Sequence, residues 1–253
     1  MAHLAETTTR GYDSINAARS ALSNIIPPEG FVSFGHHRDV TLLMRGIGNE
    51  KPKVPRSTTT WDPAKVTNYL QCRGPPRTFI EHAAKLGTLM LLASSQRGHT
   101  IHGLRTDRMH LESDKVTFQL DHLCFKQKRR SSAVEPLVFK AFDDEPSLCV
   151  VRTLRAYLAF TAKQRGFKKE LFVTSRKPHE AVHRSTFSRW VKIVLAEAGV
   201  NTEVHGAGST RAASTSAAFR DGMPLDDILK LGGWSNENTF RAFYLKPLED
   251  TSS

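Results

Sequence analysis

Residues near the C-terminus have the side-chain types that phosphodiester chemistry requires. Trp234 and Tyr244 lie ten residues apart, and Arg211 precedes both of them. A tyrosine hydroxyl is a weak nucleophile unless the electrophile is strongly polarised and its developing charge is neutralised. A phosphodiester held by arginines is such an electrophile, because each guanidinium is permanently charged and can bond two phosphate oxygens. The pattern therefore predicts cleavage and rejoining of DNA through a phosphotyrosine bond.

Each of these side chains also has a purely structural interpretation. Trp234 can pack in the core, which is compatible with donating its indole N–H to a phosphate oxygen. Tyr244 can pack beside Phe240 and Phe243, and Arg211 can be a surface residue at a helix cap. The chemical hypothesis therefore requires Arg211 and Tyr244 to meet in space.

The composition limits the classes of partner. The chain has 253 residues, of which 39% are hydrophobic and 24% charged, which is typical of a soluble globular protein with one large or two small domains. Lysine and arginine total 36 against 25 acidic residues, a formal net charge of +11. This surplus favours polyanionic partners such as nucleic acids, although other basic proteins share it.

Cysteine and histidine patterns argue against disulfide and metal chemistry. Cys72, Cys124 and Cys149 have no paired spacing, so we expect a reducing compartment. Pro178 interrupts the pair His179 and His183, and no cysteine is nearby, so we expect no metal site. No apolar run approaches membrane-spanning length and the N-terminus lacks a signal peptide, so we expect an intracellular protein with no membrane partner.

Residues 1–74 are predicted to form a small all-helical domain. Apolar residues recur at helical spacing over residues 12–25, and a second short helix is expected over residues 38–46. A Pro-, Thr- and Lys-rich connector follows, and Asp62 is expected to cap a helix that runs to Cys72. The sequence Gly-Pro-Pro at residues 74–76 marks the expected domain boundary.

Residues 77–253 are predicted to combine helices with a small antiparallel sheet, so that the whole chain is a mixed α+β, mainly helical protein. A helix over residues 78–95 is apolar on most sides and should be buried. Short strand-like runs follow, and the second turn of the sheet is basic. Later helices are expected after the caps Ser185 and Ser235 and over residues 210–219.

In their order and spacing, several segments resemble the tyrosine recombinase (phage-integrase) family, most closely the recombinases of DIRS-type retrotransposons. These segments are YDSINAARSALS, TWDP, SSQRGHTIHGL, the Lys126 region, STRAASTSAA and GGWSNENTFRAFY, and together they span nearly the whole chain. The resemblance implies a SAM-like core-binding domain and a catalytic domain around double-stranded DNA. It also implies a homotetramer that joins two DNA sites, needs no cofactor or metal, and integrates a circular retroelement. The expected location is the nucleus for a eukaryotic protein and the cytoplasm otherwise.

The resemblance also assigns roles to individual residues. Arg97 and Arg211 match the two catalytic arginines, Trp234 matches a histidine-or-tryptophan position, and Tyr244 matches the nucleophile. Lys126 resembles the lysine that protonates the departing 5′-oxygen.

The basic stretch around Lys126 has alternative interpretations. Lys128 is the other candidate for the acid, and Lys128, Arg129 and Arg130 are candidate phosphate contacts. The stretch from Lys126 to Arg130 could also serve as a nuclear import patch.

Two positions depart from the family pattern. Gly208 stands three residues before Arg211, where relatives have a histidine, and Thr100 stands where many have an acidic residue. His205 is the nearest histidine and Ser209 a neighbouring hydroxyl, and either would have to compensate. Loss of one general acid–base group typically costs ~10²–10⁴ in rate. The alternative hypotheses are a catalytically impaired DNA-binding protein and a type IB topoisomerase-like enzyme.

Overall fold

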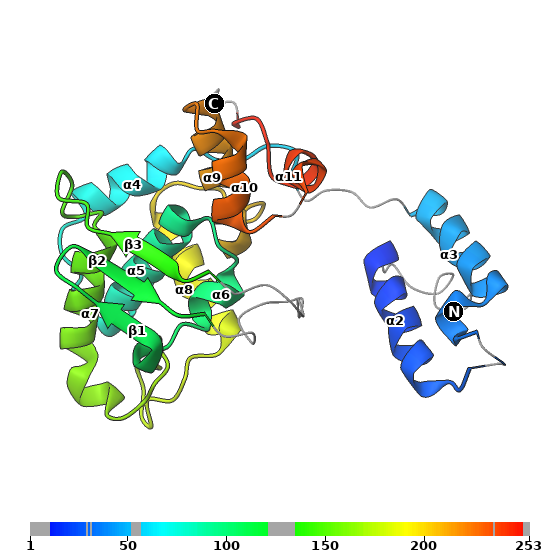
Figure 1. Cartoon of the computed structure of the whole chain (residues 1–253), viewed down its shortest axis with the longest axis horizontal. Helices are drawn as coiled ribbons and strands as arrows, with labels where there is room; N and C mark the ends of the chain where they lie inside the picture. Colours follow the sequence, from blue (N-terminus) through cyan, green and yellow to red (C-terminus); the bar gives the residue numbers. More distant parts are fainter. Residues whose placement is uncertain are drawn as a thin grey trace. The chain divides into compact units, whose positions relative to one another are not determined.

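The computed structural model describes residues 11–28, 30, 32–51, 57–120, 135–234 and 236–249 (Figure 1). The chain divides into two compact units, Met1–Arg56 and Ser57–Ser253. Each unit has its own hydrophobic core.

The first unit is built on two helices, α2 (Tyr12–Ile25) and α3 (Arg38–Glu50), with a short 3-10 helix η1 (Phe34–His36) between them. Its small core contains Ile15, Met44 and Ile47. Both helices occupy the predicted segments, although α3 continues to Glu50 because its apolar periodicity extends through Ile47.

Helix α4 (Pro63–Cys72) starts as the sequence predicts. The carboxylate of Asp62 accepts a hydrogen bond from the N–H of Ala64 at 2.9 Å, and Pro63 occupies the first turn. Val66 and Leu70 are buried in the core of the second unit. The boundary between the units therefore follows Arg56, whereas the sequence placed it at residue 74. Because the apolar face of α4 packs in the core of the second unit, α4 belongs to that unit. The Gly-Pro-Pro sequence at residues 74–76 is therefore a turn within the second unit.

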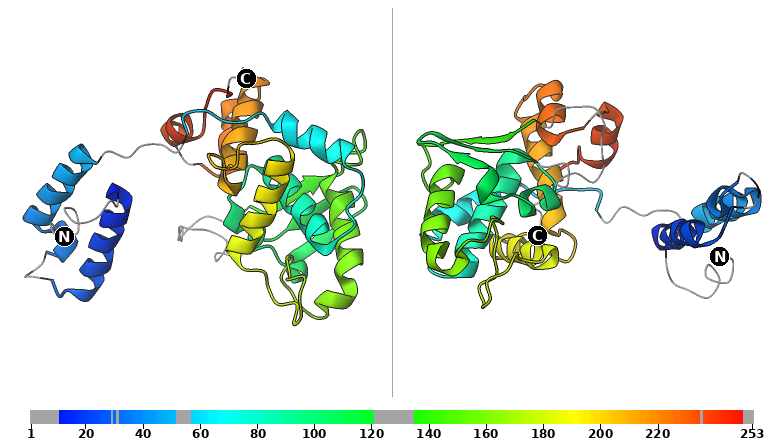
Figure 2. Two further views of the ribbon diagram at one scale, coloured as in Figure 1. Left: turned by 180° about the vertical axis from the view of Figure 1, so that it is seen from behind. Right: turned by 60° about the horizontal axis from the view of Figure 1, so that its bottom comes forward.

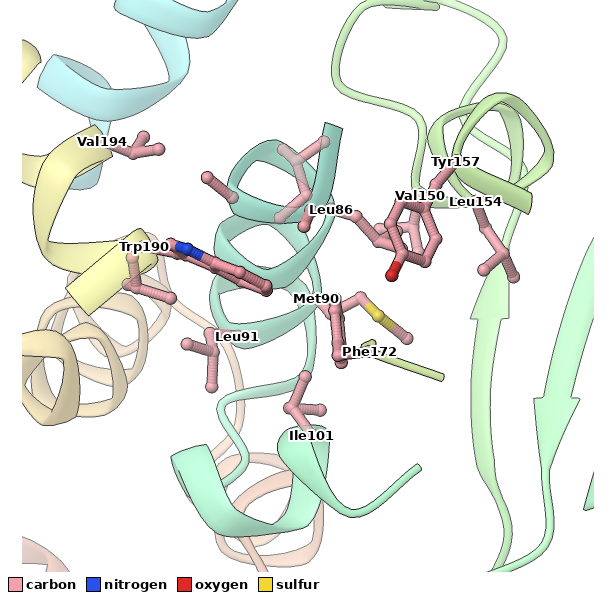
Figure 3. Packing of buried hydrophobic residues seen from close by; sticks show 14 of the residues in the cluster. Leu86, Met90, Leu91, Ile101, Val150, Leu154, Tyr157, Phe172, Trp190 and Val194 are labelled. Carbon is pink, nitrogen blue, oxygen red and sulfur yellow. The ribbon is translucent and has the colours of Figure 1, made fainter. Parts of the chain in front are cut away.

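Helix α5 (Phe79–Ser94) is the centre of the second unit. It contacts α7 (Val150–Arg165), α8 (Arg184–Glu197) and α9 (Thr210–Arg220). Figure 3 shows Leu86 and Met90 of α5 among side chains from the surrounding elements. A side chain at Gly87 would place its Cβ 2.7 Å from the ring of Phe187, so glycine permits α8 to approach closely.

A three-stranded antiparallel sheet lies beside these helices, with the strand order β1 (Met109–Leu111), β2 (Lys115–Phe118) and β3 (Leu137–Lys140). Val116 pairs with Phe139 and Phe118 with Leu137, and all four side chains are buried. The small antiparallel sheet and the mainly helical fold class are confirmed. The basic turn between β2 and β3 lies outside the described residues.

The remaining elements carry or support the candidate site. They are α6 (Gly98–His102), η2 (Thr106–Arg108), η4 (Ala207–Ser209), α10 (Leu225–Gly232) and α11 (Glu237–Phe243). Figures 1 and 2 show α9, α10 and α11 side by side. Within the described residues, no helix is both long and apolar enough to cross a membrane.

Two predicted helix caps are wrong by one or two residues. His183 caps α8 by accepting the N–H of Ser185, and Asn236 caps α11 by accepting the N–H of Asn238. Ser185 and Ser235 were the predicted caps. The cap is the residue with extended backbone whose side chain reaches the N–H two residues on, and a serine nearby is not sufficient.

Candidate active site

Arg211 lies in the first turn of α9 and is only 3% exposed. Small neighbours such as Ala212 and Ala213 allow α9 to pack closely on α5, which carries Arg211 into the interior. Its Nη2 donates to the carbonyl of Gly232 at 2.7 Å. That carbonyl is at the C-terminal end of α10, where the helix dipole stabilises a cation.

Two glycines position Trp234 against this arginine. Gly233 ends α10 in the left-handed conformation with φ of 64°. A Cβ on Gly232 would lie 1.8 Å from the indole of Trp234, so only glycine allows the ring to fold back across the end of α10. The Cζ atom of Arg211 lies 3.7 Å from the centroid of that indole, within the range of a cation–π contact.

Tyr244 completes the cluster as the residue that ends α11. Its ring is half-buried and meets Trp234 edge to face, with centroids 4.7 Å apart. The Cζ atom of Arg211 lies 5.0 Å from the centroid of the Tyr244 ring. The fold therefore brings Arg211, Trp234 and Tyr244 together from three different helices or helix ends. We refer to these three residues as the Arg211 cluster.

The Arg211 cluster contains buried N–H donors that no described residue accepts. They are Nε and Nη1 of Arg211 and Nε1 of Trp234. Leaving buried donors unpaired is costly, especially on a charged group. An anion with several oxygens would satisfy them, which is the property of a phosphodiester.

The electrostatics of Arg211 reflect the same arrangement. Burial lowers the pKa of Arg211 to about 10, and the nearby charge of Arg97 contributes in the same direction. Tyr244 acts on this pKa in the opposite direction. The Arg211 guanidinium stays charged at neutral pH, so it and Arg97 place two like charges close enough to interact.

Arg97 is exposed and is the residue that precedes α6. Ser95, which caps the C-terminus of α5, is in the left-handed conformation with φ of 52°, and the chain turns sharply before Arg97. The Oγ atoms of Ser95 and Ser214 are 2.9 Å apart, and Gln96 Nε2 donates to the carbonyl of Leu231 at 2.8 Å. These contacts hold the Arg97 turn against α9 and α10.

The structure does not place His205 in the Arg211 cluster. His205 is buried, and its Nε2 is bonded to the carboxylate of Glu249. The hydroxyl of Ser209 donates to the carbonyl of Gly206 and accepts from the indole N–H of Trp61. Both candidates for compensation are therefore engaged elsewhere. A Cβ at Gly208 would meet nothing within 4 Å, so the position of the family histidine is open space.

The segment before α4 was predicted only as an extended connector, and the structure gives it a further role. Residues 57–61, which we call the strap, lie along the chain that follows Tyr244. The N–H of Thr60 donates to the carbonyl of Pro247 at 2.8 Å, and the N–H of Glu249 donates back to Thr60 at 2.9 Å. Nζ of Lys246 reaches the carbonyl of Ser57. Consecutive β-branched residues before Trp61 were the available sequence signal for this pairing.

Several predicted site residues lie outside the described residues. They are Lys126, Lys128, Arg129 and Arg130. Their assignments as general acid and DNA contacts remain predictions.

Within the described residues, no group of three or more His, Cys, Asp or Glu side chains is arranged to hold a metal ion.

The second unit also has a surface groove that is separate from the Arg211 cluster. An open, mainly apolar groove of about 760 Å³ is lined by α4, α5 and α9 and includes Leu89, Leu92 and Met223. None of the Arg211 cluster residues lines this groove.

Comparison with solved structures shows that the chain has a fold similar to that of site-specific DNA recombinases. XerH site-specific recombinase, in a post-cleavage complex with its difH substrate, matches with a TM-score of 0.59 and 16% identity, covering 91% of this chain and 61% of XerH. The chain thus spans less than two thirds of that protein. A lambda integrase(75–356) dimer bound to a COC′ core site matches with a TM-score of 0.54 and 15% identity, covering 96% of this chain and 76% of the other.

XerA recombinase is similar in the same way, with a TM-score of 0.52 and 14% identity, covering 98% of this chain and 82% of XerA. At these identities the likeness is one of fold. No sequence model of a protein family matches the chain, and no curated protein sequence is significantly similar to it.

Proposed function

We propose that this chain, which has the tyrosine recombinase fold, cleaves and rejoins DNA strands in site-specific recombination, with Tyr244 as the nucleophile. The observation that carries the proposal is the set of buried, unpaired N–H donors of Arg211 and Trp234 beside the Tyr244 ring. A site built in this way binds an anion next to a phenol. No separate cofactor is needed, because the bond energy of the phosphodiester is kept in the phosphotyrosine.

The proposed reaction follows from the chemistry of these groups. The phenolic oxygen of Tyr244 attacks the phosphorus and transfers its proton to water, and the bond from phosphorus to the 5′-oxygen breaks. Arg97 and Arg211 neutralise the charge that grows on the non-bridging oxygens, and Trp234 donates one more hydrogen bond. Lys126 is our candidate to protonate the leaving 5′-oxygen. Attack of a 5′-hydroxyl on the 3′-phosphotyrosine reverses the steps and releases Tyr244.

Double-stranded DNA is the proposed partner. The net charge of +11 supports association with a polyanion. The XerH and lambda integrase structures contain DNA, and one of the matching structures is a lambda integrase tetramer on a Holliday junction. By analogy we propose that four protomers join two DNA sites.

The biological setting is a further part of the proposal. The sequence resemblance to DIRS-type recombinases supports integration of a retroelement and action in a eukaryotic nucleus. An adjacent reverse transcriptase reading frame in the source genome is the observation that tests this setting. A chain encoded far from any such frame would argue against it.

The central experiment traps the covalent intermediate. The native chain is incubated with a pool of nicked duplexes of randomised central sequence, in which cleavage releases a short fragment and prevents religation. We expect a denaturant-stable protein–DNA adduct and a free 5′-hydroxyl. Tyr244→Phe should form no adduct, whereas Tyr69→Phe removes a phenol from α4 and should behave like the native chain. No adduct with the native chain, or equal adduct with Tyr244→Phe, would overturn the proposal.

A specific observation favours a second candidate, a DNA-binding protein that has lost efficient cleavage. Gly208 provides no side chain, and His205 and Ser209 are bonded to Glu249, Gly206 and Trp61. Tight DNA binding without adduct in the native chain would support this candidate. Relaxation of supercoiled DNA without strand exchange would instead indicate a type IB topoisomerase-like activity.

A further inference from the structure

Ser216 of α9 holds the backbone on both sides of the residue that follows Tyr244. Its side chain is fully buried. Its hydroxyl donates to the carbonyl of Tyr244 at 2.8 Å and accepts from the N–H of Lys246 at 3.0 Å. One oxygen atom therefore bridges two backbone groups just after α11. We call this pair of hydrogen bonds the clamp.

These two backbone groups need a partner because the helix ends there. The N–H groups of Tyr244 and Leu245 both donate to the carbonyl of Phe240, which closes the last turn of α11. The carbonyl of Tyr244 and the N–H of Lys246 lie beyond that turn and are left without helical partners. A hydroxyl can satisfy both at once, since it is a donor and an acceptor at the same oxygen.

The bonding of Ser216 differs from the usual behaviour of a hydroxyl inside a helix. Serine and threonine in helices commonly bond back to a carbonyl of the preceding turn. Ser94 does so to Met90, and Thr215 does so to Arg211. Ser216, next to Thr215 on the same helix, bonds across to the end of α11 instead.

We propose that Ser216 is a positioning residue for strand cleavage, an inference that rests on the proposed function. Arg211 and Ser216 stand on the same rigid helix, α9. Ser216 fixes the backbone of Tyr244, so the distance between the phenol and the phosphate bound by Arg211 is set through α9. Attack requires near-contact alignment of the reacting atoms, and a misplacement of ~1 Å can cost roughly 10²-fold in rate.

The test compares Ser216→Ala with Thr215→Val under single-turnover conditions. At saturating nicked duplex, we expect Ser216→Ala to form adduct about 10–10²-fold more slowly than the native chain, with the same affinity for DNA. Thr215→Val removes a buried hydroxyl from the same helix without touching α11, and it should cleave at the native rate. Ser216→Cys has nearly the same size and a weak S–H donor, so an intermediate rate is expected.

A substrate with a better leaving group separates positioning from proton transfer. A 5′-bridging phosphorothiolate needs no acid to expel its sulfur, so it should restore the rate of Lys126→Ala if that lysine is the acid. It should not restore Ser216→Ala, because the attacking group is what is misplaced. Restoration of Ser216→Ala to the native rate would overturn the positioning role, as would native rates for Ser216→Ala on the ordinary duplex.

Amide hydrogen exchange tests the clamp without any cleavage. Exchange at the N–H of Lys246 should be faster in Ser216→Ala than in the native chain and unchanged in Thr215→Val. Unchanged exchange at Lys246 in Ser216→Ala would overturn the proposed clamp. If the native chain forms no adduct, both the proposed function and the catalytic role of Ser216 are refuted. The exchange measurement then still decides whether the clamp exists.

Discussion

The guanidinium carbon of Arg211 lies 3.7 Å from the centroid of the Trp234 indole. The indole covers one face of the cation and the carbonyl of Gly232 accepts one of its N–H groups, so the side chain is fixed before any ligand arrives. The N–H groups on Nε and Nη1 are left for a bound anion. A preorganised donor of this kind loses little conformational entropy on binding, which favours both affinity and transition-state stabilisation.

Replacing Trp234 with phenylalanine should separate catalysis from stability. Trp234→Phe keeps a ring beside Arg211 and removes the unpaired Nε1–H donor. We expect cleavage to slow by about 10²-fold, as for the loss of one transition-state donor. The free energy of unfolding should change by ~1 kcal/mol or less, because the lost ring area is offset by removal of a buried unpaired donor.

Single-turnover cleavage and chemical denaturation measure the two effects of Trp234→Phe. Trp190→Phe, in the core on α8, is the matched control. It should lower stability and leave the cleavage rate unchanged. A native cleavage rate for Trp234→Phe would show that its indole N–H plays no part in the reaction.

Removing the charge of Arg97 should stabilise the free protein while weakening its binding to DNA. Burial and, second to it, the charge of Arg97 lower the pKa of Arg211, and like charges that lie close together are expected to repel. Arg97→Met should raise the free energy of unfolding by at most about 1 kcal/mol and reduce the salt slope of DNA binding by about 1. Arg97→Lys keeps the charge and should do neither. A lower unfolding midpoint for Arg97→Met would contradict the predicted repulsion.

Restoring a histidine before Arg211 should increase cleavage. A Cβ at Gly208 meets nothing within 4 Å, so Gly208→His needs no rearrangement of the backbone around it. If the missing group is an acid–base catalyst, the rate should rise by up to ~10²–10⁴.

The control for Gly208→His is Gly206→His, at an equally open glycine two residues earlier. It should have no effect on the rate of adduct formation. Equal rates for native, Gly206→His and Gly208→His would mean that the chain does not use a group at this position.

The contact between Gly232 and Trp234 predicts that position 232 does not tolerate a side chain. Gly232→Ala would place its methyl group inside the indole, at 1.8 Å from Cζ3. The indole must shift, which should destabilise the protein by ~1–3 kcal/mol or more and displace the stack on Arg211. Gly98→Ala adds a methyl group in open space and should leave stability equal or slightly higher. Native unfolding midpoints and cleavage rates for Gly232→Ala would contradict this placement of the indole ring.

Local signals predicted most of the helices because those signals act over a few residues. Helix α2 covers the predicted residues 12–25, and α4 begins at its predicted Asp62 cap. Short strand-like runs also predicted the sheet. The short helix α6 was missed, because it is five residues long and carries no clear periodicity.

Contacts between residues that are far apart in the sequence could not be predicted from local sequence patterns. Residue types and a family resemblance nominated Arg211, Trp234 and Tyr244, and the structure brings them together. Nothing local indicates that Ser216 bonds to the chain after Tyr244, since the partners are 28 residues apart. The domain boundary was misplaced for a similar reason, because a Gly-Pro-Pro turn has the same composition whether it links two domains or lies within one.

The strap has a practical consequence for dissecting the protein. Ser57 and Thr60 supply hydrogen-bond partners to the chain just after Tyr244, so these few residues behave as an edge of the second unit. A truncated protein that starts at Trp61 keeps this buried core residue but lacks Ser57 and Thr60, and it should cleave DNA poorly even if it folds. One that starts at Ser57 keeps the edge, and comparing the two fragments would show how much of catalysis belongs to residues whose composition suggests only a spacer.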